Sequence, residues 1–526
     1  MEEKKLWTQK AAAMRRMLSE VPEISVYSPV TDALRRAAQL DEQEIVGALK
    51  GLSSMPQSTK AFANPVLHRA AVHCDGADIT LNIRSFAIHG VVRESEIVAG
   101  EVRPEYVIFV GLFGRKPEKV QGNLGEEAKL DALINRKFYR SRWEIREGAS
   151  RRKSLIDQVV EFVCMFSNSG PEMAIHYFST LRKANRGKNR LPDRGVNDER
   201  RDGCLLLEMI GTHMENIAVG AMAVYIRRLL REDASLIVEQ LIQRIKDFID
   251  EEEQSGKTAF QACYSLLLGH HANVVENEIL ERMGMIQIHH GSAGSNMVAR
   301  YMATVHTTSV SDFLSVSQMT LDGARHFGAI HDMTRFINEL EQLPPENRDE
   351  SIRNGVLSGG LPTFGHPEIA AAGRSDEIQQ DPRSGIYLAP LFRAIDNGDI
   401  ILDDSQRERL KMLQRVYQIA FAEGVIKPGR EKDKPLRLTP NTDFGGWSVQ
   451  EALGIDEPDR TFLTYIFRGF GWMMDVREQL LQSHMIRPVI SPHPSVVPTS
   501  SSDPTIPDLV VATHNRLVEG DAFSAH

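Results

Sequence analysis

Apolar residues recur at helical spacing over most of the chain. Between residues 233 and 249 they follow one another at short helical intervals: Val238, Leu241, Ile242, Ile245, Phe248 and Ile249. This spacing predicts an amphipathic helix with Asp233 as its N-cap. A second apolar stripe begins at Ser405 and stops at Gly424, a residue that suits a helix C-terminus. The chain is therefore expected to be mainly helical.

β-Structure is expected to be minor. Ile79, Leu81 and Ile83 alternate with polar residues, which predicts a strand near the N-terminus. Three stretches rich in Pro, Gly and charge indicate loops or boundaries between lobes, at 191–203, 343–362 and 427–441. Because prolines recur in residues 491–508, we expect 491–526 to form an extended or disordered C-terminal tail.

Composition narrows the class of protein. A chain of 526 residues is too long for one ordinary core, and 42% apolar with 25% charged residues is typical of a soluble globular protein. The net charge of -9 provides no positive field for nucleic acid or anionic lipid. The longest apolar run, Ile217–Ile226, falls short of the roughly 20 residues of a membrane-spanning helix. We expect neither nucleic acid nor a membrane as a partner.

The N-terminus mixes Glu2, Glu3 and Glu20 with basic residues and has no apolar core, unlike a secretory or organellar leader. A cytoplasmic location is therefore expected. The cysteines are too widely spaced for a CxxC pair and are expected to be reduced core residues: Cys74, Cys164, Cys204 and Cys263. Adjacent histidines, as at 270–271 and 289–290, diverge on a helix and rarely share an ion, so no metal site is expected.

Seven polar residues stand out because of the motifs around them. In chain order they are His290, His326, His366, Arg383, Asp443, Arg468 and Arg487. Any one of them alone would more often be a hydrogen-bonded structural residue. Their local contexts, taken together, indicate a functional set.

The first of these contexts resemble motifs of the citrate synthase family. IQIHHGSAGSNMVAR at 286–300 is similar to the family's LHADHExNAST, which aligns His290 with the histidine that contacts oxaloacetate. GARHFGAI is similar to GPLHGGAN and aligns His326 with the catalytic histidine. TFGHP at 363–367 resembles GYGH, and DPR at 381–383 matches the DPR that follows it, which gives His366 and Arg383.

Later motifs continue the series in the family's order. NTDFGG at 441–446 is similar to NVDxxSG and supplies Asp443. FRGFG supplies Arg468, and IRP supplies Arg487, which in the family reaches across a dimer interface. Near the start, RPEYVIFVGLFGRKP at 103–117 looks like the family's early helix and its GRLP-type turn. The resemblance spans roughly residues 79–490.

The resemblance implies a mainly α, two-domain helical fold with a small closing lobe and minor β structure near the N-terminus. It assigns residues 1–326 and 446–490 to a large domain and 327–445 to a small domain. It implies a homodimeric acyltransferase that condenses an acyl-CoA with oxaloacetate or a related 2-oxo acid and releases CoA. The CoA thioester is a substrate, and no cofactor is implied.

The residue types fit this reaction. Asp443 would remove the proton next to the thioester carbonyl, and His326 would donate to the oxygen where charge develops. His366 would polarise the keto group and protonate the new alkoxide, while His290 would bind the keto acid. Three guanidinium groups would fork onto the carboxylates of the keto acid: those of Arg383, Arg468 and Arg487.

The sequence departs from the family on the acyl-CoA side. Phe327 and Ile330 replace Gly and Asn of GPLHGGAN. They form either a hydrophobic wall for an acyl chain or packing beneath the loop. Arg374 is the first basic residue after His366 that could meet a CoA phosphate, and His289 replaces an acidic residue before His290.

Two other functions are compatible with the same residues. One is cleavage of a citryl thioester, as in lyase-like members of the fold. The other is a non-catalytic relative that binds an acid or a protein partner. Retention of all seven polar positions favours a catalyst over the second alternative.

Overall fold

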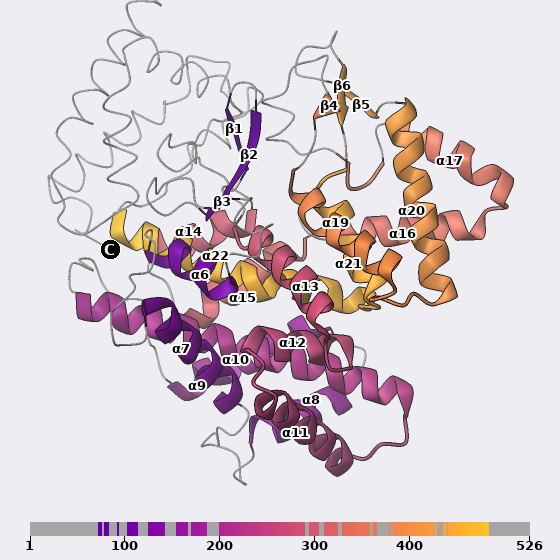
Figure 1. Ribbon diagram of the computed structural model, residues 1–526. Coiled ribbons are helices and arrows are strands. Elements are labelled where there is room, and N and C mark those ends of the chain that lie inside the picture. The colour runs from indigo at the N-terminus through magenta and orange to yellow at the C-terminus, as the bar shows by residue number, and fades with distance from the viewer. Residues whose placement is uncertain are drawn as a thin grey trace, which may run out of the picture.

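The computed structural model shows a mainly helical protein (Figure 1). It describes residues 72–75, 78–83, 92–93, 103–113, 125–141, 154–166, 170–186, 199–289, 294–304, 310–323, 329–357, 361–364, 378–379, 382–423, 425–428, 435–438 and 440–482. The predicted tail at 491–526 lies outside these residues. Within them, none of the helices combines the length and the apolar character needed to cross a bilayer.

A small antiparallel sheet lies near the N-terminal end of the sequence. Its strands are β1 (Val72–Asp75), β2 (Asp78–Ile83) and β3 (Val92–Arg93), in that order. Both neighbouring pairs are antiparallel. β2 contains the predicted alternation of Ile79, Leu81 and Ile83, so the expected strand is confirmed.

The long helix α10 (Glu199–Glu232) forms a buried centre of the helical body (Figure 1). Its apolar run Ile217–Ile226 is buried throughout, because other helices surround it. These are α7 (Glu126–Ser141), α8 (Leu155–Met165), α9 (Pro171–Arg186) and α12 (Ala259–Leu268). The longest apolar run of the sequence is thus a core segment. α10 begins inside the stretch 191–203 that was predicted as a loop.

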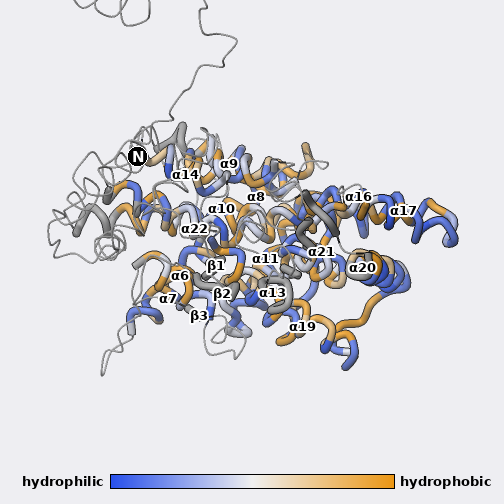
Figure 2. The backbone as a smooth tube through the Cα atoms, turned by 90° about the horizontal axis from the view of Figure 1, so that it is seen from above, coloured by the Kyte–Doolittle hydropathy of each residue, from blue (hydrophilic) through white to orange (hydrophobic). Residues whose placement is uncertain are grey.

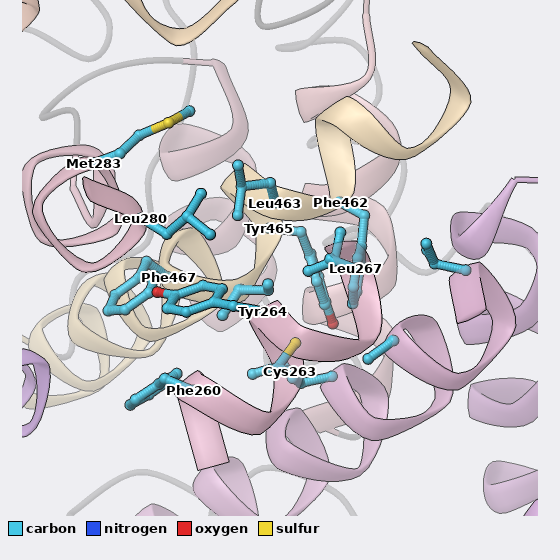
Figure 3. Close-up of a cluster of buried hydrophobic side chains, with 14 of the residues drawn as sticks. Phe260, Cys263, Tyr264, Leu267, Leu280, Met283, Phe462, Leu463, Tyr465 and Phe467 are labelled. Atoms are coloured by element: carbon cyan, nitrogen blue, oxygen red, sulfur yellow. The ribbon is translucent and has the colours of Figure 1, made fainter. Parts of the chain in front are cut away.

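A second buried helix, α22 (Arg460–Gln482), follows the short 3-10 helix η1 (Glu457–Asp459) and packs against α10. Its other neighbours are α6 (Pro104–Phe113), α13 (Val274–Gln287), α14 (Gly294–Thr304) and α15 (Val310–Leu321). Figure 3 shows aromatic and aliphatic side chains of α22 meeting those of α12 and α13, among them Phe467, Tyr264 and Leu280. This junction is a major part of the core.

Close approach between these helices depends on glycine. A Cβ atom at Gly469 would overlap the imidazole ring of His213 on α10, and one at Gly471 would overlap the carbonyl oxygen of Ile288. Neither position can hold a larger residue without a shift of its neighbour. The Gly469–Gly471 pair therefore lets α22 lie directly against α10 and against the end of α13.

The predicted helix between residues 233 and 249 begins later than expected. α11 runs from Val238 to Gln254, with Ile237 as its N-cap, so the prediction of Asp233 as the cap is wrong. Asp233 Oδ1 instead accepts hydrogen bonds from Ser235 N at 3.0 Å and from the Ser235 hydroxyl at 2.5 Å. The Gln240 side chain accepts from the Ile237 N–H at 3.1 Å and satisfies the helix start.

A further group of helices extends to one side of the body, shown in salmon to orange in Figure 1. It contains α16 (Ala329–Gln342), α17 (Pro345–Leu357), α19 (Pro382–Asn397), α20 (Asp404–Glu423) and α21 (Thr442–Ala452). Figure 2 also shows α17 and α20 at one end of the molecule, with hydrophilic stretches along them. α20 ends one residue before Gly424, which confirms the second predicted helix.

A second sheet joins this group of helices and was not expected from the sequence. β4 (Ile378–Gln379) pairs in parallel with β6 (Pro435–Leu438), which pairs antiparallel with β5 (Val425–Pro428). The stretch 427–441, predicted as a loop, thus contains strand residues. The stretch 343–362, also predicted as a loop, contains α17.

The predicted boundary between small and large domains, at residues 445 and 446, falls inside α21. Ion pairs join this helix to α20 on one side and to α22 on the other. Glu451 binds Arg409 of α20 and Arg460 at the start of α22, each at 2.7 Å. The division into domains remains a prediction, and α21 is continuous across its boundary.

The cysteine prediction holds only in part. Cys263 is a buried free thiol in α12, whereas Cys164 at the end of α8 is exposed, so the expectation of a core residue is wrong there. α8 buries another face, which includes Val159, Val160 and Val163. The side chains of Cys74 and Cys204 lie outside the described part.

Candidate active site

The structure describes part of the predicted site. Side chains are described for Asp443, Arg468 and Ile330, and the backbone for Arg383 as the second residue of α19. The other predicted residues lie outside the described ranges: His290, His326, Phe327, His366, Arg374 and Arg487. For these, the described segments that precede or follow them show which parts of the chain come together.

Asp443 lies half-buried in the first turn of α21. Asn441 caps this helix: its Oδ1 accepts from the Asp443 N–H at 2.9 Å and from the Phe444 N–H at 3.3 Å. A carboxylate in the first turn is favoured by the positive end of the helix dipole. The local sequence thus holds the Asp443 backbone in the first turn of α21.

The start of α21 is joined to the segment that leads to His366. The Asn441 N–H donates to the Thr363 carbonyl oxygen at 3.0 Å, and Phe364 forms a β-bridge with Pro440. The Phe364 ring also contacts the Phe444 ring, with centroids 5.6 Å apart. Two segments that the sequence predicted to carry a base and an acid are therefore neighbours in the fold.

Thr363 has a strained backbone at this junction. Its φ angle is 61°, and among the described residues no other non-glycine residue has a positive φ. A β-branched side chain is a genuine outlier there, at a cost of about 1–3 kcal/mol. Sequence analysis identified the TFGHP motif but missed Thr363 itself; its difference from the first glycine of GYGH was the available signal.

Arg383 belongs to a segment that starts beside the same junction. β4 ends at Gln379, which pairs with Leu438 of β6, and β6 leads within a few residues to Asn441. After β4 the chain enters α19, which packs against both α13 and α21. The backbone thus brings the N-terminal part of α19 toward the helix that carries Asp443.

Arg468 is buried in α22 and anchors the end of α13. Its Nε donates to the Gln287 carbonyl oxygen at 2.7 Å, and its Nη1 donates to Asn296 Oδ1 at 3.5 Å. Gln287 ends α13, three residues before His290, and Asn296 lies in α14 just after it. Arg468 therefore binds both sides of the connection that contains the predicted keto acid histidine.

A buried carboxylate, Asp475, organises the same region and was missed by sequence analysis. Its Oδ1 binds His289 Nε2 at 3.0 Å and Arg300 Nη2 at 2.5 Å, and its Oδ2 accepts from Asn296 Nδ2 at 2.5 Å. Burial by itself raises the pKa of Asp475, but Arg300, His289 and Asn296 together hold that pKa below its usual value. Asp475 lies seven residues after Arg468, a helical spacing that was the available signal.

The helix that carries Asp443 contacts the end of α13, where Arg468 binds. A Cβ atom at Gly446 would lie 3.5 Å from Gln287 Nε2 and 3.7 Å from Ile330 Cδ1. Ile330, in the first turn of α16, is fully buried. The helix of Asp443 thus lies against the end of α13, whose carbonyl group binds Arg468. Ile330 packs beneath this contact.

The predicted absence of a metal was based partly on the paired histidines. In the structure, His270 Nε2 lies 3.0 Å from Glu276 Oε1, and His271 Nε2 lies 3.0 Å from Glu251 Oε2. His289 Nε2 lies 3.0 Å from Asp475 Oδ1. Over the described ranges, no three His, Cys, Asp or Glu side chains gather in a way that could hold a metal ion.

Solved structures of citrate synthases have a similar fold. The citrate synthase of Thermoplasma acidophilum, solved in a ternary complex with carboxymethyl coenzyme A and oxaloacetate, has a TM-score of 0.54 at 13% identity and covers 83% of this chain and 95% of that one. The enzyme of Pyrobaculum aerophilum has a TM-score of 0.52 at 15% identity, with coverage of 83% and 91%. That of Thermotoga maritima has a TM-score of 0.52 at 14% identity, with coverage of 86% and 99%.

At these identities the structural likeness establishes the fold alone, and it confirms the predicted mainly α citrate synthase fold. No curated protein matches the chain by sequence. The family model of the citrate synthase C-terminal domain matches residues 151–489, which is more than half of the chain. The protein therefore belongs to the citrate synthase family.

Proposed function

We propose that this protein condenses an acyl-CoA with oxaloacetate or a related 2-oxo acid and releases CoA. One observation supports the proposal: contacts between described residues join segments that lead to several of the predicted site residues. Asn441 joins the segment before His366 to the helix of Asp443. Arg468 joins α22 to the segment before His290.

The proposed reaction divides the work between two sides of the site. On the thioester side, Asp443 removes the α-proton while His326 donates to the thioester oxygen. The resulting nucleophilic carbon attacks the keto carbon, and His366 protonates the new alkoxide. Water then cleaves the thioester, which releases the free thiol of CoA and a carboxylic acid.

On the keto acid side, His290 and three arginines would bind and orient the substrate. Arg468 is already fixed by Gln287 and Asn296, so its guanidinium plane is preorganised. Arg383 and Arg487 would complete the set of carboxylate partners. Arg374 is the candidate contact to a CoA phosphate. Phe327 is the candidate contact to the acyl chain, while the burial of Ile330 favours packing for that residue.

The proposal also includes the assembly and the setting of the protein. We infer that the protein is a cytoplasmic homodimer. We also infer that it needs no resident cofactor, because the residues named above supply the acid, the base and the anion-binding groups of the reaction. The CoA thioester enters and leaves as a substrate. The small domain, residues 327–445, would close over both substrates and exclude water.

The experiment is a condensation assay with purified protein, oxaloacetate and a panel of acyl-CoAs, read as thiol release and product mass. Asp443→Asn is the matched control, since it removes the base and preserves shape. We expect a loss of roughly 100-fold or more in turnover with oxaloacetate binding retained. Thiol release at the same rate in both proteins would exclude Asp443 from the reaction. Binding without any turnover by the wild type would identify a non-catalytic relative, and cleavage of a citryl thioester alone would identify a lyase.

A further inference from the structure

Thr363 combines two unfavourable features in one residue. Its backbone adopts the left-handed conformation that a β-branched residue avoids. Its side chain is buried, with 5% of the residue exposed, and the hydroxyl oxygen has no hydrogen-bond partner in the described part of the chain. A buried hydroxyl without a partner also costs folding free energy. Such costs concentrate where a protein uses a residue for function.

The surroundings of Thr363 fix its conformation. Its carbonyl oxygen accepts from the Asn441 N–H at 3.0 Å, and the next residue, Phe364, is held by the bridge to Pro440 and by the Phe444 ring. The strained backbone is thus held from the direction of α21. These contacts use the backbone of Thr363 and the ring of Phe364, and they leave the hydroxyl group unused.

The neighbours of Thr363 indicate which reactant it would meet. The residue it binds, Asn441, caps the helix whose first turn carries Asp443. Asp443 is the proposed base for the thioester, whereas Arg468, the proposed keto acid ligand, is anchored by Gln287 and Asn296. Thr363 therefore lies next to the helix that carries the proposed base for the thioester.

We propose that the Thr363 hydroxyl donates a hydrogen bond to an oxygen atom of the bound acyl-CoA, which makes Thr363 a substrate-binding residue. This inference rests on the proposed function. The bond supplies a partner that the hydroxyl lacks among the described residues. Binding of the thioester then satisfies a polar group that has no partner in the described part of the chain.

Three variants separate the hydroxyl from the backbone strain. Thr363→Val keeps the branched shape and removes the hydroxyl, Thr363→Ser keeps the hydroxyl and removes the branch, and Thr363→Gly relieves the strained φ angle. We expect the Val and Gly variants to lose about 10-fold in kcat/KM for acyl-CoA, since an acceptor in the substrate loses its donor. The Ser variant should stay within about 3-fold of the wild type, and the KM for the 2-oxo acid should change little in all three.

Stability gives an independent measurement on the substrate-free protein. If the hydroxyl has no partner there, Thr363→Val removes an unsatisfied polar group and should unfold at the same temperature as the wild type or higher. A clearly lower Tm for this variant would mean that the hydroxyl is already bonded within the protein, which would overturn the inference. Equal kcat/KM values for wild type, Val and Ser variants would overturn it as well.

Failure of this inference is distinguishable from failure of the proposed function. A wild-type protein that condenses no acyl-CoA with any 2-oxo acid contradicts the proposed function, and it also removes the reactant that Thr363 was proposed to bind. An active wild type whose Val variant is equally active contradicts only the role of Thr363.

Discussion

Burial of a charged side chain costs free energy that its partners must offset, and Asp475 is the clearest case in this protein. It is completely buried and lies among His289, Asn296 and Arg300. A buried charge is tolerated when several groups stabilise it, and removal of one partner leaves the others without compensation. The position of Asp475 therefore links protein stability to the segment that leads to His290.

We predict that Asp475→Asn destabilises the protein by about 3–5 kcal/mol, because Arg300 loses its buried counter-charge. The measurement is the free energy of unfolding from denaturant titration. Asp456→Asn is the matched control, since Asp456 also binds an arginine, Arg231, but both side chains are well exposed. An exposed pair contributes about 0–1 kcal/mol. Similar losses in the two variants would contradict the assigned role of the buried network.

A second residue-scale prediction concerns Glu172 in the first turn of α9. Burial and the neighbouring Asp322 raise the pKa of Glu172 from 4.5 to about 8. Between these two values the folded protein keeps a proton that the unfolded chain has released. Its contribution to stability is therefore largest at the acidic end of this window and is lost as the pH rises toward 8.

Glu172→Gln imitates the protonated side chain and should make the decline in stability with rising pH shallower. The slope attributable to one such group is about 1.4 kcal/mol per pH unit. Unfolding free energies of both proteins should be compared from pH 6.5 upward. Below that value His213, whose pKa burial lowers from 6.5 to about 4, contributes in the opposite direction. Parallel curves for the two proteins would show that Glu172 is ionised in the folded state.

At the scale of the residue, sequence patterns proposed Asp443 and Arg468 as candidate site residues but did not predict the groups that hold them in place. His289 and Asp475 are 186 positions apart, and Thr363 and Asn441 meet only through the fold. Motifs record residue types along the chain, whereas these pairings depend on how α13, α14, α21 and α22 pack. Such contacts are long-range and leave no local periodicity.

At the scale of the element, the sequence patterns predicted helices correctly where a regular apolar stripe continued over many residues. They failed where proline was taken only as a sign of a loop. Pro345 is the first residue of α17, where proline lacks no needed donor. Pro428 ends β5 and Pro435 begins β6, both strand ends at which proline is tolerated. Asp233 was misassigned because Ser235 takes up its side chain in a turn.

The packing of α22 leads to a prediction at this scale. Gly471→Ala should destabilise the protein strongly and weaken 2-oxo acid binding, because the new Cβ would meet the Ile288 backbone. Backbone cannot yield as a side chain can, so α22 or the end of α13 must shift. Overpacking typically costs about 1–3 kcal/mol. Thermal unfolding and calorimetric titration with oxaloacetate would measure the two effects.

Gly211→Ala is the control for this prediction, since a Cβ there would lie 3.4 Å from the flexible end of Lys137. That distance is ordinary contact, and alanine favours the helix over glycine. The control should therefore be neutral or stabilising. A Gly471→Ala protein as stable as the control would mean that α22 and Ile288 are not packed as closely as described.

At the scale of the whole molecule, several large apolar side chains are exposed on one group of neighbouring helices. They lie on α8, α9, α14 and α15, which are neighbours in the fold. The residues are Met165, Phe166, Met173, Tyr177, Tyr301, Val316 and Met319, with exposed fractions from 38% to 68%. Exposed apolar side chains on neighbouring helices are typical of contact sites between proteins. The surface of these helices is therefore the candidate interface of the proposed homodimer.

We predict that a double variant, Met173→Glu with Met319→Glu, is monomeric by light scattering at micromolar concentration, because charges at the centre of an apolar interface have no partner. If Arg487 reaches across the interface, the monomer should also lose turnover, even though each chain keeps its fold with Asp443 and Arg468 in place. Ile401→Glu is the control: this side chain is 87% exposed but lies outside the surface, so the variant should stay dimeric and active. A monomeric double variant with full turnover would show that each chain contains a complete site, and an intact dimer would exclude this surface as the interface.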